Sequence, residues 1–272
     1  MRSIESALAW TGIVLLLIVW LPMLAVVRLF DWRAPHYATG RLFRRVGWAI
    51  TKVNPAWKVT VTGELPADPR LPYVVVANHQ SNADIPLVST LPWEMKWVAK
   101  KELFQIPVAG WMLRMAGDIA VDRKDPDSRA SVMRRARAVL AQRCSVMFFA
   151  EGTRSRDGRV RAFRDGAFRL AIDAGAPVLP LAIDGTASAL PKHGWRFGEA
   201  DCRLHVLPPV PTEGLGEGDV AALRERVRSA IVAHIAMWRG VAPDAVDATA
   251  DAAAPSEAGV AVENSAKSAV GG

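Results

Sequence analysis

The sequence predicts an α/β fold in which a mixed, largely parallel sheet is flanked by helices and preceded by a hydrophobic N-terminal anchor. Three observations support this prediction. Short runs of β-favouring residues alternate with amphipathic segments of helical length, which is typical of strand-helix-strand units. Clusters of polar residues directly follow two of the apolar runs, at 78–82 and 151–159. An uncharged stretch long enough to cross a bilayer lies near the N-terminus.

The anchor is predicted within residues 1–45, because residues 7–27 contain no charged side chain. As a helix this stretch would be roughly 30 Å long, enough to span the hydrocarbon core. Pro22 also permits a helical hairpin that lies in one leaflet, and both arrangements agree with the sequence. A cleaved signal peptide fits less well, since only Arg2 precedes the stretch and no A-x-A-like site follows it.

Basic residues follow the apolar stretch and outnumber those before it. They are Arg28, Arg33, Arg41, Arg44, Arg45 and Lys52. By the positive-inside rule, this excess predicts that the next domain lies on the cytoplasmic face of the inner membrane.

The globular domain is predicted over residues 46–240. Strand-like runs lie at 57–64, 73–77, 93–99, 118–123, 144–150, 177–183 and 203–207, and helical periodicity covers 84–91, 106–117, 128–142, 168–174 and 220–239. The carboxyl ends of parallel strands share one edge of a sheet, so the polar clusters after 73–77 and 144–150 are expected to meet. Residues 241–272 contain almost no large apolar side chains and predict a disordered tail.

Composition narrows the classes of partner. The formal net charge is +7, and acidic residues outnumber basic ones after residue 240, so the positive excess lies in the rest of the chain. Such a surface attracts anions, and an anionic membrane or a phosphorylated substrate fits it as well as nucleic acid does. Because no nucleic-acid-binding motif is present, we expect no such partner. The five histidines and two cysteines follow no ligand spacing, so we expect no metal site.

The first polar cluster, NHQSNAD at 78–84, places His79 and Asp84 in one loop between a strand and a helix. On a regular helix the two side chains would lie about 140° apart, so their pairing requires a turn that folds Asp84 back. The carboxylate would then accept from one imidazole nitrogen and leave the other free to take a proton. The alternative is a purely structural His–Asp pair that caps the loop.

The second cluster begins with EGTRS at 151–155. It joins a flexible glycine, Gly152, to Arg154, whose planar guanidinium matches a phosphate group with two hydrogen bonds. These residues predict a phosphate-binding loop at a strand end. An ordinary surface turn is the competing interpretation.

Four blocks in this order resemble the glycerolipid acyltransferases. NHQSNAD is similar to their NHxxxxD block and EGTRS to their third block, while GDIAVDR at 117–123 and VLPLAIDG at 178–185 resemble the second and fourth. The resemblance covers roughly residues 50–215 and is closest to the bacterial 1-acyl-sn-glycerol-3-phosphate acyltransferases. It implies a glycerol-3-phosphate acyltransferase-like fold and transfer of a fatty acyl group to the sn-2 hydroxyl of 1-acyl-sn-glycerol 3-phosphate, which yields phosphatidic acid.

The resemblance also implies roles for individual residues. His79 would be the general base, and Asp84 would hold its tautomer. The acceptor, lysophosphatidic acid, would be bound by Glu151, Gly152, Thr153, Arg154, Lys100 and Arg123. The donor would be acyl-CoA or acyl carrier protein, used as a co-substrate, and no cofactor is expected. The alternatives are another lysophospholipid or an aminolipid as acceptor, thioester hydrolysis, and a lipid-binding membrane protein without catalysis.

Two positions depart from the family pattern. Ala120 stands where the second block usually has an aromatic residue, and Ala150 replaces the common proline before the glutamate. Both changes are expected to widen an acceptor or acyl pocket. A tunnel that measures acyl length is a further hypothesis, with core packing as its alternative, for the apolar residues Phe104, Ile106, Val108, Trp111, Met112 and Met115.

Overall fold

The computed structural model describes residues 2–122 and 124–250. Its strands are β1 (Trp57–Gly63), β2 (Val74–Ala77), β3 (Met95–Lys100), β4 (Ile119–Val121), β5 (Ser145–Phe149), β6 (Val178–Asp184) and β7 (Ala200–Val206). Its helices are α1 (Arg2–Phe30), α2 (Tyr37–Val53), α3 (Asp84–Val88), α4 (Ala109–Met115), α5 (Pro126–Ala141), α6 (Gly166–Ala174), α7 (Thr186–Ala189), α8 (Val220–Arg239) and α9 (Pro243–Val246), with 3₁₀ turns at η1 (Lys101–Gln105) and η2 (Glu217–Asp219).

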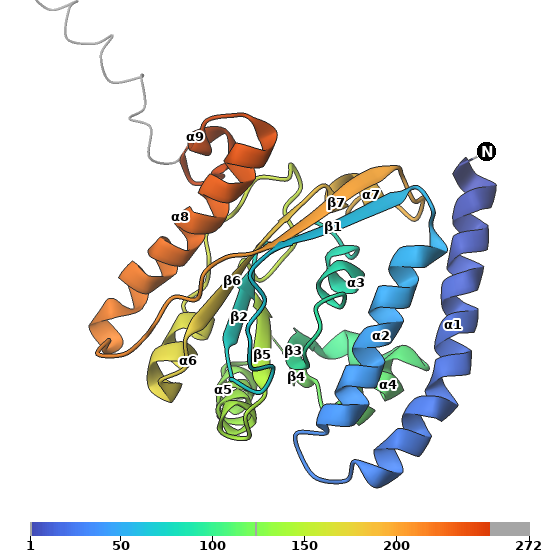
Figure 1. The fold of residues 1–272 in the computed structure, drawn as a ribbon, viewed down its shortest axis with the longest axis horizontal. Coiled ribbons are helices and arrows are strands. Elements are labelled where there is room, and N and C mark those ends of the chain that lie inside the picture. Colours follow the sequence, from blue (N-terminus) through green and yellow to red (C-terminus); the bar gives the residue numbers. More distant parts are fainter. Residues whose placement is uncertain (1, 123, 251–272) are drawn as a thin grey trace, which may run out of the picture.

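The strands form one sheet in the order β1-β7-β6-β2-β5-β3-β4. Every neighbouring pair is parallel except β6 and β7, which run antiparallel. The prediction of a mixed, largely parallel sheet between helices is therefore confirmed (Figure 1). Each predicted strand and helix is present, although several are shorter than expected: α3, for example, ends at Val88.

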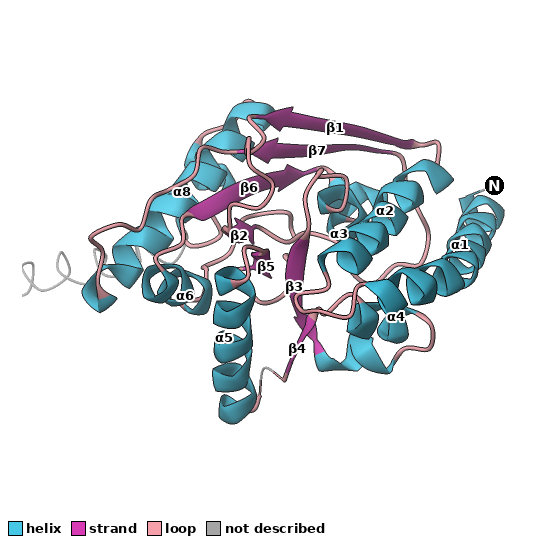
Figure 2. Cartoon of the chain, turned by 60° about the horizontal axis from the view of Figure 1, so that its bottom comes forward, coloured by secondary structure: helices cyan, strands magenta, loops and turns pink. Residues whose placement is uncertain are grey.

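Strand β2 lies at the centre because its side chains are apolar on both faces. Val74 and Val76 pack into the cluster on one face, and Val75 and Ala77 pack into the cluster on the other. All four are fully buried, as expected for a parallel strand covered by helices on both sides. Helices α5, α6 and α8 cover the first face, and α2, α3 and α4 lie over the second (Figure 2).

The N-terminal segment is a hairpin of two helices. Helix α1 is continuous through Pro22 and packs along α2 at the edge of the molecule (Figure 1). Near its start, Trp10 donates a hydrogen bond to the carbonyl of Trp195 at 2.7 Å. Near its end, the buried Leu24 packs on Val46 of α2. The predicted division at residue 45 thus falls inside α2.

Buried charges fix α2 to the sheet. Arg44 of α2 donates to Asp118 at 2.6 Å, and Lys96 donates to Glu94 at 2.8 Å. All four side chains are nearly inaccessible to solvent, and Arg44 also lies 3.6 Å from Glu94. Because an unpaired charge at such depth would be costly, these pairs specify how the hairpin seats on the domain.

The segment after α8 corrects the prediction of a disordered tail over 241–272. Residues 243–246 form α9, and Val246 is fully buried. Asp247 forms an ion pair with Arg228 of α8. Composition alone missed this because one valine and one ion pair are enough to hold a short segment against a preformed surface. The part of the predicted tail after residue 250 lies outside the described residues.

Candidate active site

The loop after β2 is joined to β6 by a side-chain amide. The Asn78 side chain donates to the carbonyl of Ile183 and accepts from the Ile183 backbone N–H, both at 2.9 Å. The amide therefore continues the hydrogen-bond ladder between the strands by one step after β2 ends at Ala77. It holds the next residue, His79, at the carboxyl edge of the sheet.

His79 and Asp84 form the predicted pair. Nδ1 of His79 lies 2.7 Å from Oδ2 of Asp84. The imidazole also stacks on Phe149 of β5, with 3.9 Å between ring centroids. The His79 side chain is 13% exposed, so the ring is held on one face and reachable at its edge.

The Asp84 carboxylate is fully buried and accepts several hydrogen bonds. Oδ2 accepts from the backbone N–H groups of Gln80 at 2.8 Å and Ser81 at 3.0 Å, in addition to the imidazole. Such donors stabilise the ionised carboxylate. An ionised Asp84 requires a proton on Nδ1 of His79, so Nε2 presents a lone pair. This arrangement suits a general base.

The loop after β5 lies directly against the first loop. Oε1 of Glu151 accepts from the backbone N–H of His79 at 2.8 Å, and the backbone N–H of Ser155 donates to the carbonyl of His79 at 2.8 Å. The first and third sequence blocks therefore meet at one residue. The expectation that polar clusters share a rim agrees with this geometry.

Burial raises the pKa of Glu151 to about 7, because the carboxylate loses its hydration there. The backbone N–H groups of His79 and Arg161 and the Arg161 charge oppose the rise, while the nearby Asp84 charge adds to it. Glu151 thus titrates near neutral pH within hydrogen-bond distance of the base-bearing loop.

Three arginines of the loop after β5 and the carboxylate of Glu151 all interact electrostatically with Lys192. The ammonium group of Lys192 donates to the backbone carbonyl of Arg154 at 2.6 Å. Burial and the charges of Arg156, Arg154 and Arg161 lower the pKa of Lys192. This cluster, Arg154, Arg156, Arg161 and Lys192, is called the cationic cluster below. Such an accumulation of positive charge next to a candidate base suits a phosphate ester.

Both the backbone conformation at residue 152 and the side chain packed over it require a glycine there. Its φ of 71° lies in the left-handed region, and an added Cβ would come within 2.5 Å of the Arg164 guanidinium nitrogen Nε. Thr153, the next residue of the motif, is partly buried in the same loop. The third block therefore combines a tight turn with an arginine packed over it.

Two predicted phosphate contacts stand apart from this cluster. Lys100, the last residue of β3, forms an exposed ion pair with Glu102 at 3.2 Å. Its position at the carboxyl edge is shared with the site, but the structure pairs it within its own turn. Arg123 lies outside the described residues.

Two apolar cavities flank the site. A cavity of about 410 Å³ reaches Phe149, Ala150 and Gly152 from the α5 and α6 side. A second, of about 200 Å³, lies between α2, α3 and α4 and reaches Ile85 and Pro86, next to Asp84. Of the apolar residues from 104 to 115 proposed to line a tunnel, only Ile106 lines this second cavity. Phe104 and Met112 are core residues instead.

Sequence reasoning missed several residues that shape the site: Asn78, Gln80, Arg156, Arg161 and Lys192. The amides carry no signal beyond their place in the first block. Lys192 lies in a loop more than thirty positions after the third block, and nothing in its neighbourhood marks it. Within residues 2–122 and 124–250, no group of three potential ligands is close enough to hold a metal ion.

Comparison with known proteins agrees with this geometry. Residues 58–184, which hold both loops, match the family described as Acyltransferase. This segment is therefore similar to an acyltransferase domain. Among curated relatives, the human 1-acyl-sn-glycerol-3-phosphate acyltransferase alpha is 40% identical over 177 residues, covering 64% of this chain and 62% of the relative. A chloroplastic 1-acyl-sn-glycerol-3-phosphate acyltransferase of Arabidopsis thaliana is 34% identical over 190 residues, covering 69% of this chain and 51% of the relative.

A solved structure is similar over most of the chain. The crystal structure of the 1-acyl-sn-glycerophosphate acyltransferase PlsC from Thermotoga maritima superposes with a TM-score of 0.67 at 26% identity. The match covers 85% of this chain and 96% of that chain. The chain spans a smaller share of the human relative, about three-fifths of its length (62%).

Proposed function

We propose that this protein transfers a fatty acyl group from an acyl thioester to the sn-2 hydroxyl of 1-acyl-sn-glycerol 3-phosphate, producing phosphatidic acid. The observation that carries the proposal is the His79–Asp84 pair, joined at 2.7 Å and linked through Glu151 to the cationic cluster. The printed names of the relatives at 40% and 34% identity, both 1-acyl-sn-glycerol-3-phosphate acyltransferases, support the choice of acceptor.

The proposed chemistry begins at Nε2 of His79. An alcohol is a weak nucleophile at neutral pH, so its proton must leave as the new C–O bond forms. Nε2 takes that proton while the hydroxyl oxygen attacks the thioester carbonyl. Asp84 stabilises the resulting imidazolium through Nδ1. The C–S bond then breaks, and the imidazolium returns the proton to the departing thiolate.

The acceptor is oriented by the loop after β5. The cationic cluster binds the phosphate, with the Arg154 guanidinium offering a pair of donors. Glu151 accepts from the His79 backbone through Oε1 and interacts electrostatically with Arg161 and Lys192, and we assign it a hydrogen bond from the glycerol backbone. The donor is acyl-CoA or acyl carrier protein, and one of the two apolar cavities receives its chain.

The hairpin supports attachment to one leaflet of a membrane. Residues Ser3–Phe30 are long and apolar enough to cross a bilayer, but α1 bonds to Trp195 near its start and shares an apolar cluster with Met112 of α4 near its end. These contacts support a helix that lies along the domain over one that is surrounded by lipid. Its outward side chains remain exposed, among them Leu8, Leu15, Val19 and Leu29. We place the protein on the cytoplasmic face of the inner membrane, where soluble donors are available.

The proposal is tested with the purified protein in phospholipid vesicles. Labelled acyl-CoA and acyl carrier protein are each offered with lysophosphatidic acid, a lysophospholipid lacking the phosphomonoester, an aminolipid, or no acceptor. We expect phosphatidic acid as the main product and no turnover with the His79→Ala variant. Preference for another acceptor, which the small Ala150 beside the larger cavity would accommodate, would defeat the choice of lysophosphatidic acid. Equal thioester cleavage without acceptor would indicate a hydrolase.

A further inference from the structure

The segment that follows the third block, residues 156–161, carries two of the four cations of the cationic cluster, Arg156 and Arg161. Its own hydrogen bonds form a small turn: the Gly158 N–H donates to Oγ of Ser155 at 3.0 Å, and that hydroxyl donates to Asp157 at 2.9 Å. A turn of this size does not fix its place relative to the sheet. Contacts from outside the segment must do so.

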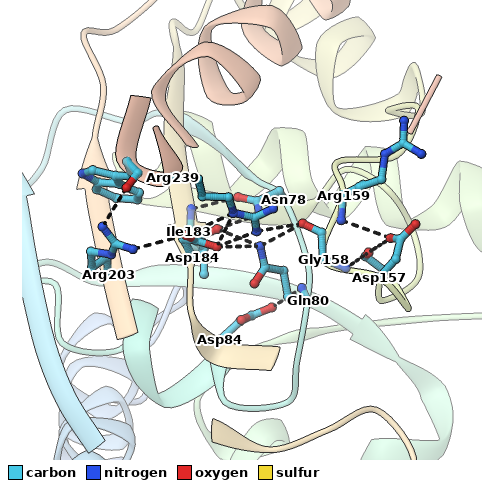
Figure 3. Close-up of polar contacts among 12 residues, drawn as sticks. Asn78, Gln80, Asp84, Asp157, Gly158, Arg159, Ile183, Asp184, Arg203 and Arg239 are labelled. Atoms are coloured by element: carbon cyan, nitrogen blue, oxygen red, sulfur yellow. Dashed lines mark hydrogen bonds and ion pairs between the residues drawn. The ribbon is translucent and has the colours of Figure 1, made fainter. Parts of the chain in front are cut away.

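The first outside contact comes from the last residue of α8. The Arg239 guanidinium donates to the carbonyl of Gly158 at 2.9 Å and to Oδ1 of Asp184 at 2.6 Å (Figure 3). Asp184, at the end of β6, is buried and also faces Arg203 at 3.5 Å. Arg239 therefore ties the turn at Gly158 to the central part of the sheet.

The same point is linked to the catalytic loop. The side-chain amide of Gln80 donates toward Ile183 at 3.2 Å, Asp184 at 3.4 Å and Gly158 at 3.5 Å (Figure 3). The backbone N–H of Gln80 donates to Asp84. Arg239 and Gln80, the residue next to His79, thus share Gly158 and Asp184 as acceptors.

The second outside contact comes from the segment after α8. The Val160 N–H donates to the carbonyl of Val246 at 2.8 Å, and the Ala248 N–H donates to the carbonyl of Val160 at 3.0 Å. Arg228 of α8 donates to the carbonyls of Val160 at 3.3 Å and Arg161 at 3.2 Å. Two backbone bonds and an arginine therefore hold the end of segment 156–161.

We propose that Arg239 and residues 243–249, which we call the C-terminal clamp, position segment 156–161 so that its cations meet the phosphate of the acceptor lipid. This inference rests on the proposed function for the identity of that lipid. Arg239 is a positioning residue: its donors are engaged by Asp184 and Gly158, and it acts on the phosphate through the segment. The clamp thereby sets affinity for a phosphorylated acceptor.

The test measures lipid binding to the full-length protein in detergent micelles by titration calorimetry. The probes are lysophosphatidic acid and a monoacylglycerol of the same chain, which lacks only the phosphate. Arg239→Gln is expected to weaken lysophosphatidic acid binding about tenfold and monoacylglycerol binding by less than about twofold. The matched control is Arg226→Gln, an exposed arginine on the same helix, and it should change neither affinity. Where Arg239→Gln does not yield folded protein, Arg239→Lys is used, with an expected loss of about threefold.

Steady-state kinetics give the second measurement. The KM for lysophosphatidic acid should rise with the dissociation constant, while kcat and the KM for the acyl donor stay within about threefold. Equal weakening of both lipids, or an unchanged affinity for lysophosphatidic acid in a folded variant, would overturn the inference. A wild-type protein that binds lysophosphatidic acid without acylating it would instead refute the proposed function and leave the binding result for the clamp intact.

Discussion

The loops after β2 and after β5 meet at His79 but are held in different ways. The first, residues 78–84, is fastened to β6 by the Asn78 amide, but its internal geometry is set from within: its own aspartate is fully buried and accepts from the imidazole and two backbone N–H groups of the same loop. The second, residues 151–161, is held from outside by α8 and the segment that follows it. A proton-accepting group needs one fixed geometry. A phosphate cradle needs charges that distant parts of the chain bring together.

The largest effect is expected where the first loop loses its charge. In Asp84→Asn the imidazole no longer faces a carboxylate, so neither its tautomer nor the imidazolium is stabilised. We expect kcat for acylation of lysophosphatidic acid to fall by about 10² to 10⁴. The measurement is a steady-state assay in vesicles.

The thermal midpoint of the same variant serves as its control. A fall in kcat explained by unfolding would lower the midpoint below the assay temperature. Retention of more than about a tenth of wild-type kcat in folded protein would show that Asp84 does not assist the base.

Removing the cation of the second loop should act on binding. Arg154→Ala deletes a charge-assisted pair of hydrogen bonds worth about 1.5–3 kcal/mol, so the KM for lysophosphatidic acid should rise about 10- to 100-fold. The KM for the acyl donor should stay unchanged. Arg226→Ala, at an exposed position of α8, is the matched control. A loss confined to kcat would place Arg154 at the reacting carbonyl rather than at the phosphate.

The contact between the two loops can be tested by pH. Because burial raises the pKa of Glu151 from the usual 4.5 to about 7, the folded protein binds this proton more tightly than the unfolded chain. The resulting stability is fully present below pH 4.5 and is lost as pH rises to 7, and it amounts to at most about 3 kcal/mol. Glu151→Gln removes the titration.

Thermal unfolding of the wild type and of Glu151→Gln between pH 4.5 and 8 measures the contribution of Glu151 to stability. The midpoint of the wild type relative to the variant should decrease across the range and level off above pH 7. Parallel curves would mean that Glu151 keeps an ordinary acidity in the folded protein.

The difference between the loops also explains which parts of the fold and of the site could be predicted from the sequence. Alternation and apolar runs located every strand, and strand ends located His79 and Glu151 on one edge, because these signals are local. The His79–Asp84 pair was predictable for the same reason, since five residues separate its members. A hairpin that turns at Pro22 was one of two arrangements expected, and it was wrong in place: α1 continues through Pro22, and the chain turns only between Phe30 and Tyr37.

What the sequence did not predict depends on contacts between distant residues. Lys192 reaches the carbonyl of Arg154 across 38 positions, and Arg239 reaches Gly158 across 81. No periodicity records such pairs. Composition predicted that residues 241–250 are disordered. Composition does not reveal what orders them, because they are held by one buried valine, Val246, against a surface that other elements create.

The smallest effect is expected when the residues after α8, which bond to Val160, are removed. A chain ending at residue 240 keeps Arg239 but loses the backbone bonds of Val246 and Ala248 to Val160, whereas a chain ending at residue 250 keeps both. We expect the shorter chain to show a KM for lysophosphatidic acid about threefold higher than the longer one, with kcat unchanged. Burial of Val246 adds about 1.5–3 kcal/mol of stability, so the thermal midpoint should also fall. If only the midpoint falls, then Arg239 alone positions the segment, and the residues after α8 serve stability; if the KM rises as well, the phosphate site depends on a part of the chain that its sequence motif does not include.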